Sequence, residues 1–191
     1  MHRLYDRLMR LAASNRALPA LAVIAFIESS VFPIPPDLML IPMILAAPRN
    51  AWRYAAVATL CSVAGGFLGY AIGYYLFTML GRPILEFYGM MGRYAALQAA
   101  YAHWGVWIIV LKGMTPLPYK LVTIASGALG FPLVAFGAAS LVSRAMRFFL
   151  VAALLYFFGE PIRAFIERRL ALVTSLFAVL LVGGFVAVAY L

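Results

Sequence analysis

The stretch FIESSVFPIPPD, residues 26–37, decides the fold class, because it breaks an apolar run where a regular helix cannot continue. Pro33, Pro35 and Pro36 each remove an amide donor and clash with the preceding helical turn. The apolar run around them covers residues 19–47, which is too short to cross a bilayer twice at about 20 residues per crossing. The run is therefore either one broken span or a re-entrant hairpin that turns near the middle of the membrane.

The composition indicates that the rest of the chain also lies in lipid. Hydrophobic residues make up 66% of the 191 residues and charged residues 11%, whereas soluble domains have roughly 45–50% and 25%. A soluble fold of this size could not cover so much apolar surface. The net charge is +9. Because the charges lie at the ends of apolar runs, we expect anionic lipid headgroups as partners and no nucleic acid.

The other apolar runs give the domain organisation. A second proline break, at Pro116 and Pro118, interrupts residues 104–130, and Gly81 with Pro83 ends the long apolar run that begins near residue 52. The chain is expected to form a single membrane domain. Its expected parts are an amphipathic arm over 1–18, a re-entrant hairpin over 19–47, a transmembrane helix over 52–80, an interfacial connection over 82–103, a second re-entrant hairpin over 104–130, and transmembrane helices over 131–158 and 170–191.

Small residues mark one face of the helix expected over 52–80. Gly65, Gly69 and Gly73 recur every four residues, so they lie on the same side of that helix. Glycines at this spacing let two helix backbones approach closely in a membrane. We therefore expect this face to pack against other helices.

The two halves of the chain repeat one pattern. A shift of 83 residues places the first pair of prolines on the second and Asp37 on Lys120. Each half is then a broken segment followed by a long helix, and broken segments in corresponding positions are typical of transporters with inverted repeats. The expected fold is all-α and polytopic, with an inverted repeat of two re-entrant helical hairpins, each followed by a transmembrane helix, and a C-terminal transmembrane helix.

Basic residues set the expected orientation. If both broken segments are re-entrant, nine basic residues fall on one side of the membrane, and Arg82 and Arg93 fall on the other. The positive-inside rule makes the nine-residue side cytoplasmic. This predicts a multi-pass protein of the bacterial inner membrane with a cytoplasmic N-terminus. If the first segment crosses fully instead, Arg49 and Arg53 change sides and the charge bias weakens.

Six ionisable residues fall at membrane depth in this layout. A charge near the bilayer centre costs about 3 kcal/mol or more, so it is kept only where it is paired or faces a polar cavity. Four of the six are basic and two are acidic, and the surplus of positive charge suits a bound anion, for which phosphate is the natural candidate. The expected substrate-binding residues are Arg144, Arg147, Lys112 and Lys120, and the expected proton-coupling or gating residues are Glu28 and Asp37.

Two interpretations of these charges stay open. Arg144 and Arg147 are three residues apart and share a helical face, so they either bind substrate together or pair with Glu28 and Asp37. The two carboxylates are either titratable groups that couple proton entry to anion movement or partners in structural salt bridges.

The sequence gives little support to an enzyme. His2 and His103 are the only histidines, Cys61 is the only cysteine, and no nucleotide-binding loop or nucleophile elbow occurs. No cluster of metal ligands appears, so neither a metal nor a cofactor is expected.

Three stretches together carry a resemblance to a known family. They are residues 26–37, the GGFLGY stretch 65–70 with Gly73, and residues 112–120 followed by Ala125-Ser126-Gly127. Over about residues 20–160 the chain resembles the DedA superfamily, also called SNARE-associated or VTT-domain proteins, in a small bacterial branch of the YqaA type. The resemblance implies two opposed re-entrant hairpins and translocation of membrane lipids.

The resemblance also implies roles for particular residues. Glu28 and Asp37 match the acidic positions of the family's first hairpin. Lys112 and Lys120 occupy the place of the family's Arg-x-x-Pro-x-x-Arg motif, but this chain has lysines there, with three residues between each lysine and Pro116. Arg144 and Arg147 are expected to compensate for the missing arginines.

The leading expectation is a transporter or flippase of a lipid-linked phosphate, similar to undecaprenyl phosphate or another anionic phospholipid, with proton coupling and homo-oligomerisation left open. Bacterial members of the superfamily look like such transporters and often depend on the proton gradient. Its eukaryotic members look like phospholipid scramblases, so an uncoupled scramblase is one alternative. A non-transporting membrane scaffold, in which the buried charges are merely paired, is the other.

Overall fold

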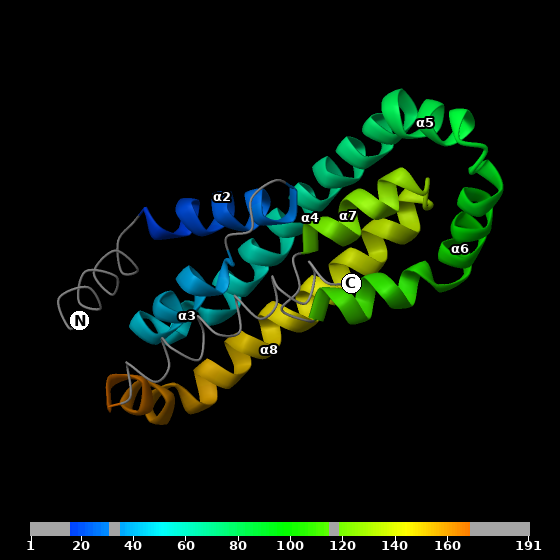
Figure 1. The fold of residues 1–191 in the computed structure, drawn as a ribbon. Coiled ribbons are helices and arrows are strands. Elements are labelled where there is room, and N and C mark those ends of the chain that lie inside the picture. The colour runs from blue at the N-terminus through cyan, green and yellow to red at the C-terminus, as the bar shows by residue number, and fades with distance from the viewer. Residues whose placement is uncertain (1–15, 31–34, 115–118, 169–191) are drawn as a thin grey trace.

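The structure is a computed structural model, and it describes residues 16–30, 35–114 and 119–168. All regular structure within these ranges is helical, and no strand occurs there (Figure 1). The elements in chain order are α2 (Ala17–Ser30), α3 (Asp37–Ala46), the 3-10 turn η1 (Pro48–Asn50), α4 (Ala51–Leu76), the π-helical turn η2 (Phe77–Gly81), α5 (Arg82–Phe87), α6 (Met91–Met114), α7 (Tyr119–Ala128) and α8 (Leu133–Arg168).

Three helical stretches are long and apolar enough to cross a membrane: Pro48–Phe87, Met91–Gly113 and Leu133–Gly159. This confirms the expected class, a helical protein associated with a membrane. The span expected over 170–191 and residues 1–15 of the expected arm lie outside the described residues.

The helix expected over 52–80 does not stop at Gly81 and Pro83. Instead α4 widens into the π-helical turn η2 and continues as α5, with Pro83 in the first turn of α5. A proline has no amide hydrogen and its ring collides with the carbonyl four residues earlier. The wider π turn directly before Pro83 accommodates the proline, so the helix changes register and does not end.

The connection expected over 82–103 is shorter in the structure. The chain turns at Gly89, whose φ is 65°, and the amides of Gly89 and Met90 donate to the carbonyls of Glu86 and Leu85. Helix α6 then begins at Met91 and runs without a break to Met114. The polar residues that suggested a connection are compatible with a helix, and only the glycine turn interrupts it.

Helices α2, α3 and α7 are each too short to cross a bilayer. Helix α2 has 14 residues, and α3 and α7 have 10 each, which gives lengths of about 21, 15 and 15 Å against a hydrocarbon thickness of about 30 Å. In Figure 1, α2 and α3 lie toward the start of α4, whereas α6 and α7 lie toward its far end. Helix α4 packs against α2, α7 and α8, and it is the centre of the fold.

The three spaced glycines of α4 lie at its crossings with α2 and α7. A Cβ at Gly65 would overlap the carbonyl oxygen of Phe26 in α2, and one at Gly73 would overlap the carbonyl oxygen of Ile124 in α7. Gly69 lies between them, against both Ser29 of α2 and Thr123 of α7. This face therefore packs closely against other helices, as the spacing predicts, and in doing so it brings the end of α2 and the middle of α7 together.

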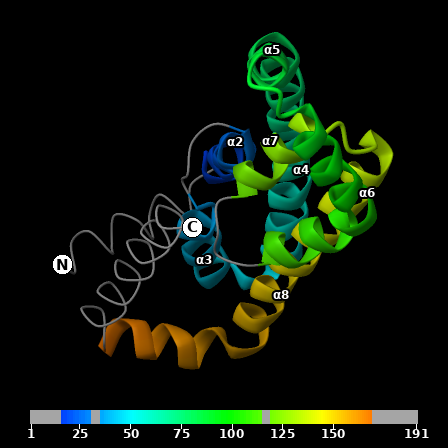
Figure 2. The same cartoon turned by 45° about the vertical axis from the view of Figure 1, so that its right-hand side comes forward.

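Helix α8 bends at the point where a helix end was expected. Phe158 has non-helical torsion angles (φ −119°, ψ 17°), and Pro161 follows three residues later. Beyond the bend the chain stays helical to Arg168, so most of the stretch between the helices expected over 131–158 and 170–191 is a second helical arm (Figure 2). A proline inside a helix causes such a kink because it removes one hydrogen bond.

Two apolar clusters pack along α8, and polar residues separate them. Phe136 and Ala139 belong to a cluster with α6 and α7, whereas Phe148 and Ala152 belong to a cluster with α2, α3 and α4. The stretch between residues 139 and 148 is the part of α8 where a polar site could form.

Candidate functional site

A stripe of polar side chains runs along the middle of α8. Ser140, Ser143, Arg144 and Arg147 are spaced by three, one and three residues, so they share one face. Ser140 and Ser143 are fully buried, and Arg144 is 2% exposed. The stripe lies near the centre of the apolar span Leu133–Gly159. Such a position makes a charge costly, so each arginine needs a partner.

Arg144 lies among residues from three helices. Its Nη2 is 3.8 Å from Oε2 of Glu28 near the end of α2. Its guanidinium carbon lies 3.6 Å above the centroid of the Tyr119 ring, at the start of α7, and 6.0 Å from that of Phe148. The buried Nε has no hydrogen-bond acceptor within the described residues. Arg144 is thus neutralised by a carboxylate at some distance and stacked on an aromatic face, which attracts cations.

Arg147 has a closer partner. Its Nη2 donates to Oδ2 of Asp37 at 2.5 Å, and the two side chains are 21% and 15% exposed. Asp37 is the first residue of α3, where the helix dipole favours a negative charge. The other carboxylate oxygen of Asp37 is buried and has no hydrogen-bond partner among the described residues.

Hydroxyl groups connect Glu28 to the helices around it. The Ser29 hydroxyl lies 3.1 Å from Oε2 of Glu28 and 2.7 Å from the hydroxyl of Ser62 on α4. Thr123 on α7 donates to the carbonyl oxygen of Ser29 at 3.1 Å. The end of α2 is therefore held by polar contacts to α4 and α7 in addition to the glycine crossings.

Tyr119 is a site residue that the sequence analysis missed. It is fully buried, its ring lies beneath Arg144, and its hydroxyl donates to Ser140 at 2.5 Å. The sequence does contain a sign of a larger polar site around Arg144. Ser140 lies one helical turn before Arg144 and Ser143 lies directly before it, within a mostly apolar helix. Tyr119 also directly precedes Lys120 at the second proline break.

The structure brings four of the six expected charged residues together, as the two pairs Arg144 with Glu28 and Arg147 with Asp37. The two lysines are not part of these pairs. Lys112, near the end of α6, is exposed, and Lys120, in the first turn of α7, is half-buried; each makes interactions of its own. Each lysine is the sequence neighbour of a residue at the site. Lys112 precedes Gly113, which lies against Ser143, and Lys120 follows Tyr119, which contacts Arg144.

The expected hairpin breaks are described in part. Pro35 and Pro36 directly precede α3, and their carbonyls accept from the amides of its first residues. Pro33, Pro116 and Pro118 lie outside the described residues.

Side chains of α6 and α4 donate hydrogen bonds to the backbone carbonyls at the end of α7 and just after it. Tyr94 and Gln98 of α6 donate to the carbonyls of Ala128 and Leu129, each at 2.9 Å. Tyr70 of α4 donates to the carbonyl of Phe131 at 2.6 Å. In lipid, a non-helical turn needs such internal partners because no water is available.

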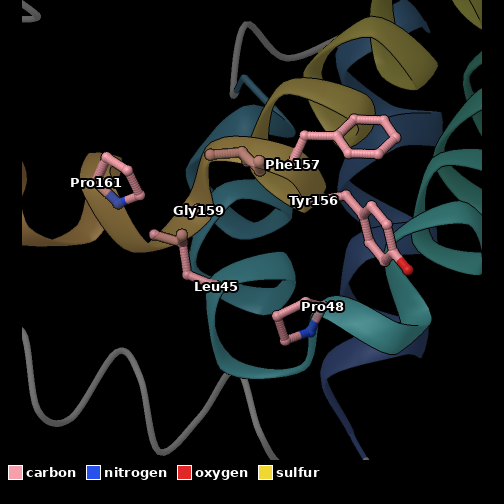
Figure 3. Close-up of a pocket in the computed structure, with 7 residues that line it drawn as sticks. Leu45, Pro48, Tyr156, Phe157, Gly159 and Pro161 are labelled. Carbon is pink, nitrogen blue, oxygen red and sulfur yellow. The ribbon is translucent and has the colours of Figure 1, made fainter.

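A hollow of about 470 Å³ lies away from the charged stripe, beside the kink of α8 (Figure 3). Figure 3 shows its lining side chains coming from the end of α3, from η1 and from α8 on both sides of Gly159. The residues that line it are apolar or aromatic in type, and they are Leu45, Pro48, Leu155, Tyr156, Phe157, Gly159 and Pro161. None of the residues that line this hollow takes part in the ion pairs of Arg144 and Arg147.

The chemistry available at the site is set by the groups that converge on it. Within the described ranges, no three His, Cys, Asp or Glu side chains lie close enough to hold a metal ion. The groups that converge are two guanidinium groups, two carboxylates, an aromatic ring and several hydroxyls. Guanidinium groups bind phosphate oxygens through paired N–H donors, and carboxylates compete with phosphate for them.

Comparison with known proteins identifies relatives over nearly the whole chain. The chain is 35% identical over 170 residues to an uncharacterized protein of Haemophilus influenzae, covering 89% of this chain and 88% of the other. It is 33% identical over 167 residues to an uncharacterized protein of Histophilus somni, covering 87% of each. No family model matches the chain, and no solved structure matches it. At this identity and coverage, the chain belongs to the same family as these two proteins.

Proposed function

We propose that the protein is a transporter or flippase of a lipid-linked phosphate, and a member of the DedA superfamily in the bacterial inner membrane. One observation carries the proposal. Two arginines lie near the centre of a helix that is long enough to span a membrane, and their carboxylate partners come from the facing ends of two helices that are too short to do so.

The order of the helices supports the inverted repeat. Helices α2, α3 and α4 in the first half correspond to α6, α7 and α8 in the second under the shift of 83 residues. In this proposal, α2 with α3 and the later part of α6 with α7 are the two re-entrant hairpins. Figure 1 shows α6 curving from the α5 end of the molecule toward its centre, which is the course that such a hairpin requires.

The contact between Thr123 and Ser29 supports a meeting of the two hairpins. It joins the end of α2 to α7: Ser29 follows Glu28 in the chain, and Thr123 lies one helical turn after Tyr119. A substrate that passes between the hairpins would therefore meet the charged site. The basic residues at the ends of the long helices favour an orientation with the N-terminus in the cytoplasm.

Exchange of ionic partners gives the transport step. A phosphate headgroup would displace Glu28 or Asp37 from its arginine, and the released carboxylate, left in a poorly solvated place, would take up a proton. Return of the carboxylate would release both the lipid and the proton. Lys112 and Lys120, beside the second break, would attract the headgroup from the membrane surface.

The ion pairs also favour a second candidate, a non-transporting scaffold. Both arginines have carboxylate partners, which is what a purely structural role requires. The two candidates differ in the effect of neutralising Arg144 and Arg147 together. Stability would fall in either case, because Glu28 and Asp37 would lose their partners, but only a transporter would also lose anion transport.

Translocation in vesicles tests the proposal. The protein is reconstituted, and the movement of a fluorescent polyprenyl phosphate is followed with and without a pH gradient, beside a phosphatidylcholine analogue. The proposal predicts movement of the phosphate lipid alone, and a response to the gradient supports proton coupling. Equal movement of both lipids would make the protein a scramblase, and movement of neither would leave the scaffold.

A further inference from the structure

The two arginines of the site are held in different ways, although they lie one helical turn apart. Arg147 makes a hydrogen bond of 2.5 Å to Asp37. The Nη2 atom of Arg144 is 3.8 Å from Oε2 of Glu28, which is beyond hydrogen-bonding distance, and its guanidinium carbon lies 3.6 Å from the centroid of the Tyr119 ring. The more deeply buried arginine therefore has the weaker ionic partner.

Arg144 also has an unused donor. Its side chain is 2% exposed, and its Nε has no acceptor within the part of the chain that the structure describes. A buried donor without an acceptor is costly, and a guanidinium group presents its N–H groups in a fixed planar fork. A phosphate oxygen is an acceptor that fits this fork.

Two sets of contacts keep Arg144 in this state. The Ser29 hydroxyl bonds to the Glu28 carboxylate and also to the hydroxyl of Ser62 on α4. The ring of Tyr119 is fully buried, and its hydroxyl donates to Ser140, one turn before Arg144 on α8. The guanidinium group thus lies over an aromatic ring that is packed inside the protein.

We propose that Tyr119 is a positioning residue, which holds Arg144 on its ring and short of a close ion pair with Glu28. Arg144 is then the group that takes the phosphate oxygens, through Nε–H and an Nη–H, while Arg147 stays with Asp37. The inference rests on the proposed function for its substrate class, a phosphate monoester on a lipid chain.

Binding of dodecyl phosphate to the purified full chain in a maltoside detergent tests the inference, with dodecylphosphocholine as the reference ligand. Loss of the aromatic platform in Tyr119→Leu should weaken dodecyl phosphate binding about 5- to 30-fold, the equivalent of a desolvated cation–π contact. Tyr119→Phe keeps the ring and should stay within about threefold of the wild type. Tyr101→Leu is the matched control, because Tyr101 is a buried tyrosine that packs on Phe131 and bonds to Ser126, away from Arg144.

Lysine substitutions test the division of roles between the arginines. Arg144→Lys keeps the charge but removes Nε–H and the planar stack, so it should weaken binding about tenfold or more. Arg147→Lys can keep one bond to Asp37 and should weaken binding less than about threefold. A tyrosine with a merely structural role would lower thermal stability without changing the preference for dodecyl phosphate over dodecylphosphocholine.

Three results would overturn the inference: a folded Tyr119→Leu with wild-type affinity and preference, equal losses in the two lysine variants, or no binding of dodecyl phosphate by the wild type. If Tyr119→Leu does not fold, the lysine pair alone decides. The binding assay does not depend on translocation. If the variants bind dodecyl phosphate as predicted but the protein moves no lipid in vesicles, the proposed transport function is refuted and the inference about Tyr119 stands. If Tyr119→Leu moves the lipid at the wild-type rate, the inference is refuted and the transport function stands.

Discussion

The crossing of α4 with α2 makes a sharp prediction at two neighbouring glycines. A Cβ at Gly65 would overlap the carbonyl oxygen of Phe26, which is backbone and cannot rotate away. A Cβ at Gly66 would have its nearest neighbours, atoms of Thr123, Phe136 and Tyr119, at 3.5–3.6 Å, which is ordinary contact. Overpacking of a tight interface costs about 1–3 kcal/mol, whereas alanine is favoured over glycine in a helix by about 1 kcal/mol.

Gly66→Ala should therefore be as stable as the wild type or about 1 kcal/mol more stable. Gly65→Ala should be less stable than Gly66→Ala by about 2 kcal/mol or more, since α2 must move away from α4. Unfolding of the detergent-solubilised protein by sodium dodecyl sulfate, followed by the fluorescence of its 3 tryptophans, measures the difference. Equal stability of the two variants would refute the close crossing of α2 and α4.

Other contacts lead to predictions that the same titration checks. Glu28→Gln leaves the Arg144 guanidinium buried without its counter-charge and should cost about 3 kcal/mol, at the low end for a broken buried pair because the two groups are 3.8 Å apart. Adding Arg144→Gln should recover most of that loss, and a double variant no more stable than the single one would contradict the pairing. Tyr70→Phe removes the hydrogen bond to the Phe131 carbonyl and should cost about 1–2 kcal/mol. Tyr75→Phe, whose ring is 63% exposed, should have no effect, and an equal loss in both would speak against the bond.

Much of the fold follows from the sequence because lipid imposes few alternatives. The apolar runs predict helices, and the glycines spaced by four predict a face of α4 that packs closely against other helices; the structure shows that these are α2 and α7. The bend at Phe158 lies where the sequence predicts a helix end. The polar residues over 82–103 predict a connection, but most of that stretch belongs to α6, which includes Gln98. In the structure, that side chain bonds to the carbonyl of Leu129.

The site was predictable in its charges but not in its pairing. Spacing places Arg144 and Arg147 on one face of α8, yet it says nothing of which carboxylate each one meets, since that depends on how α2 and α3 pack. The sequence left open whether the two arginines pair with Glu28 and Asp37, and in the structure they do. The place of Tyr119 beneath Arg144 depends on a contact between α7 and α8, which no local pattern specifies.

The most direct test of the account is transport by a charge-balanced variant, Glu28→Gln with Arg144→Gln. Removing both members of the buried pair leaves no unpaired charge, so the variant should remain folded. In vesicles that contain equal amounts of folded protein, the account predicts that this variant moves a polyprenyl phosphate at least about tenfold more slowly than the wild type, the loss expected for an exchanged charge-assisted contact. Transport at the wild-type rate would contradict the claim that this ion pair lies on the path of the phosphate.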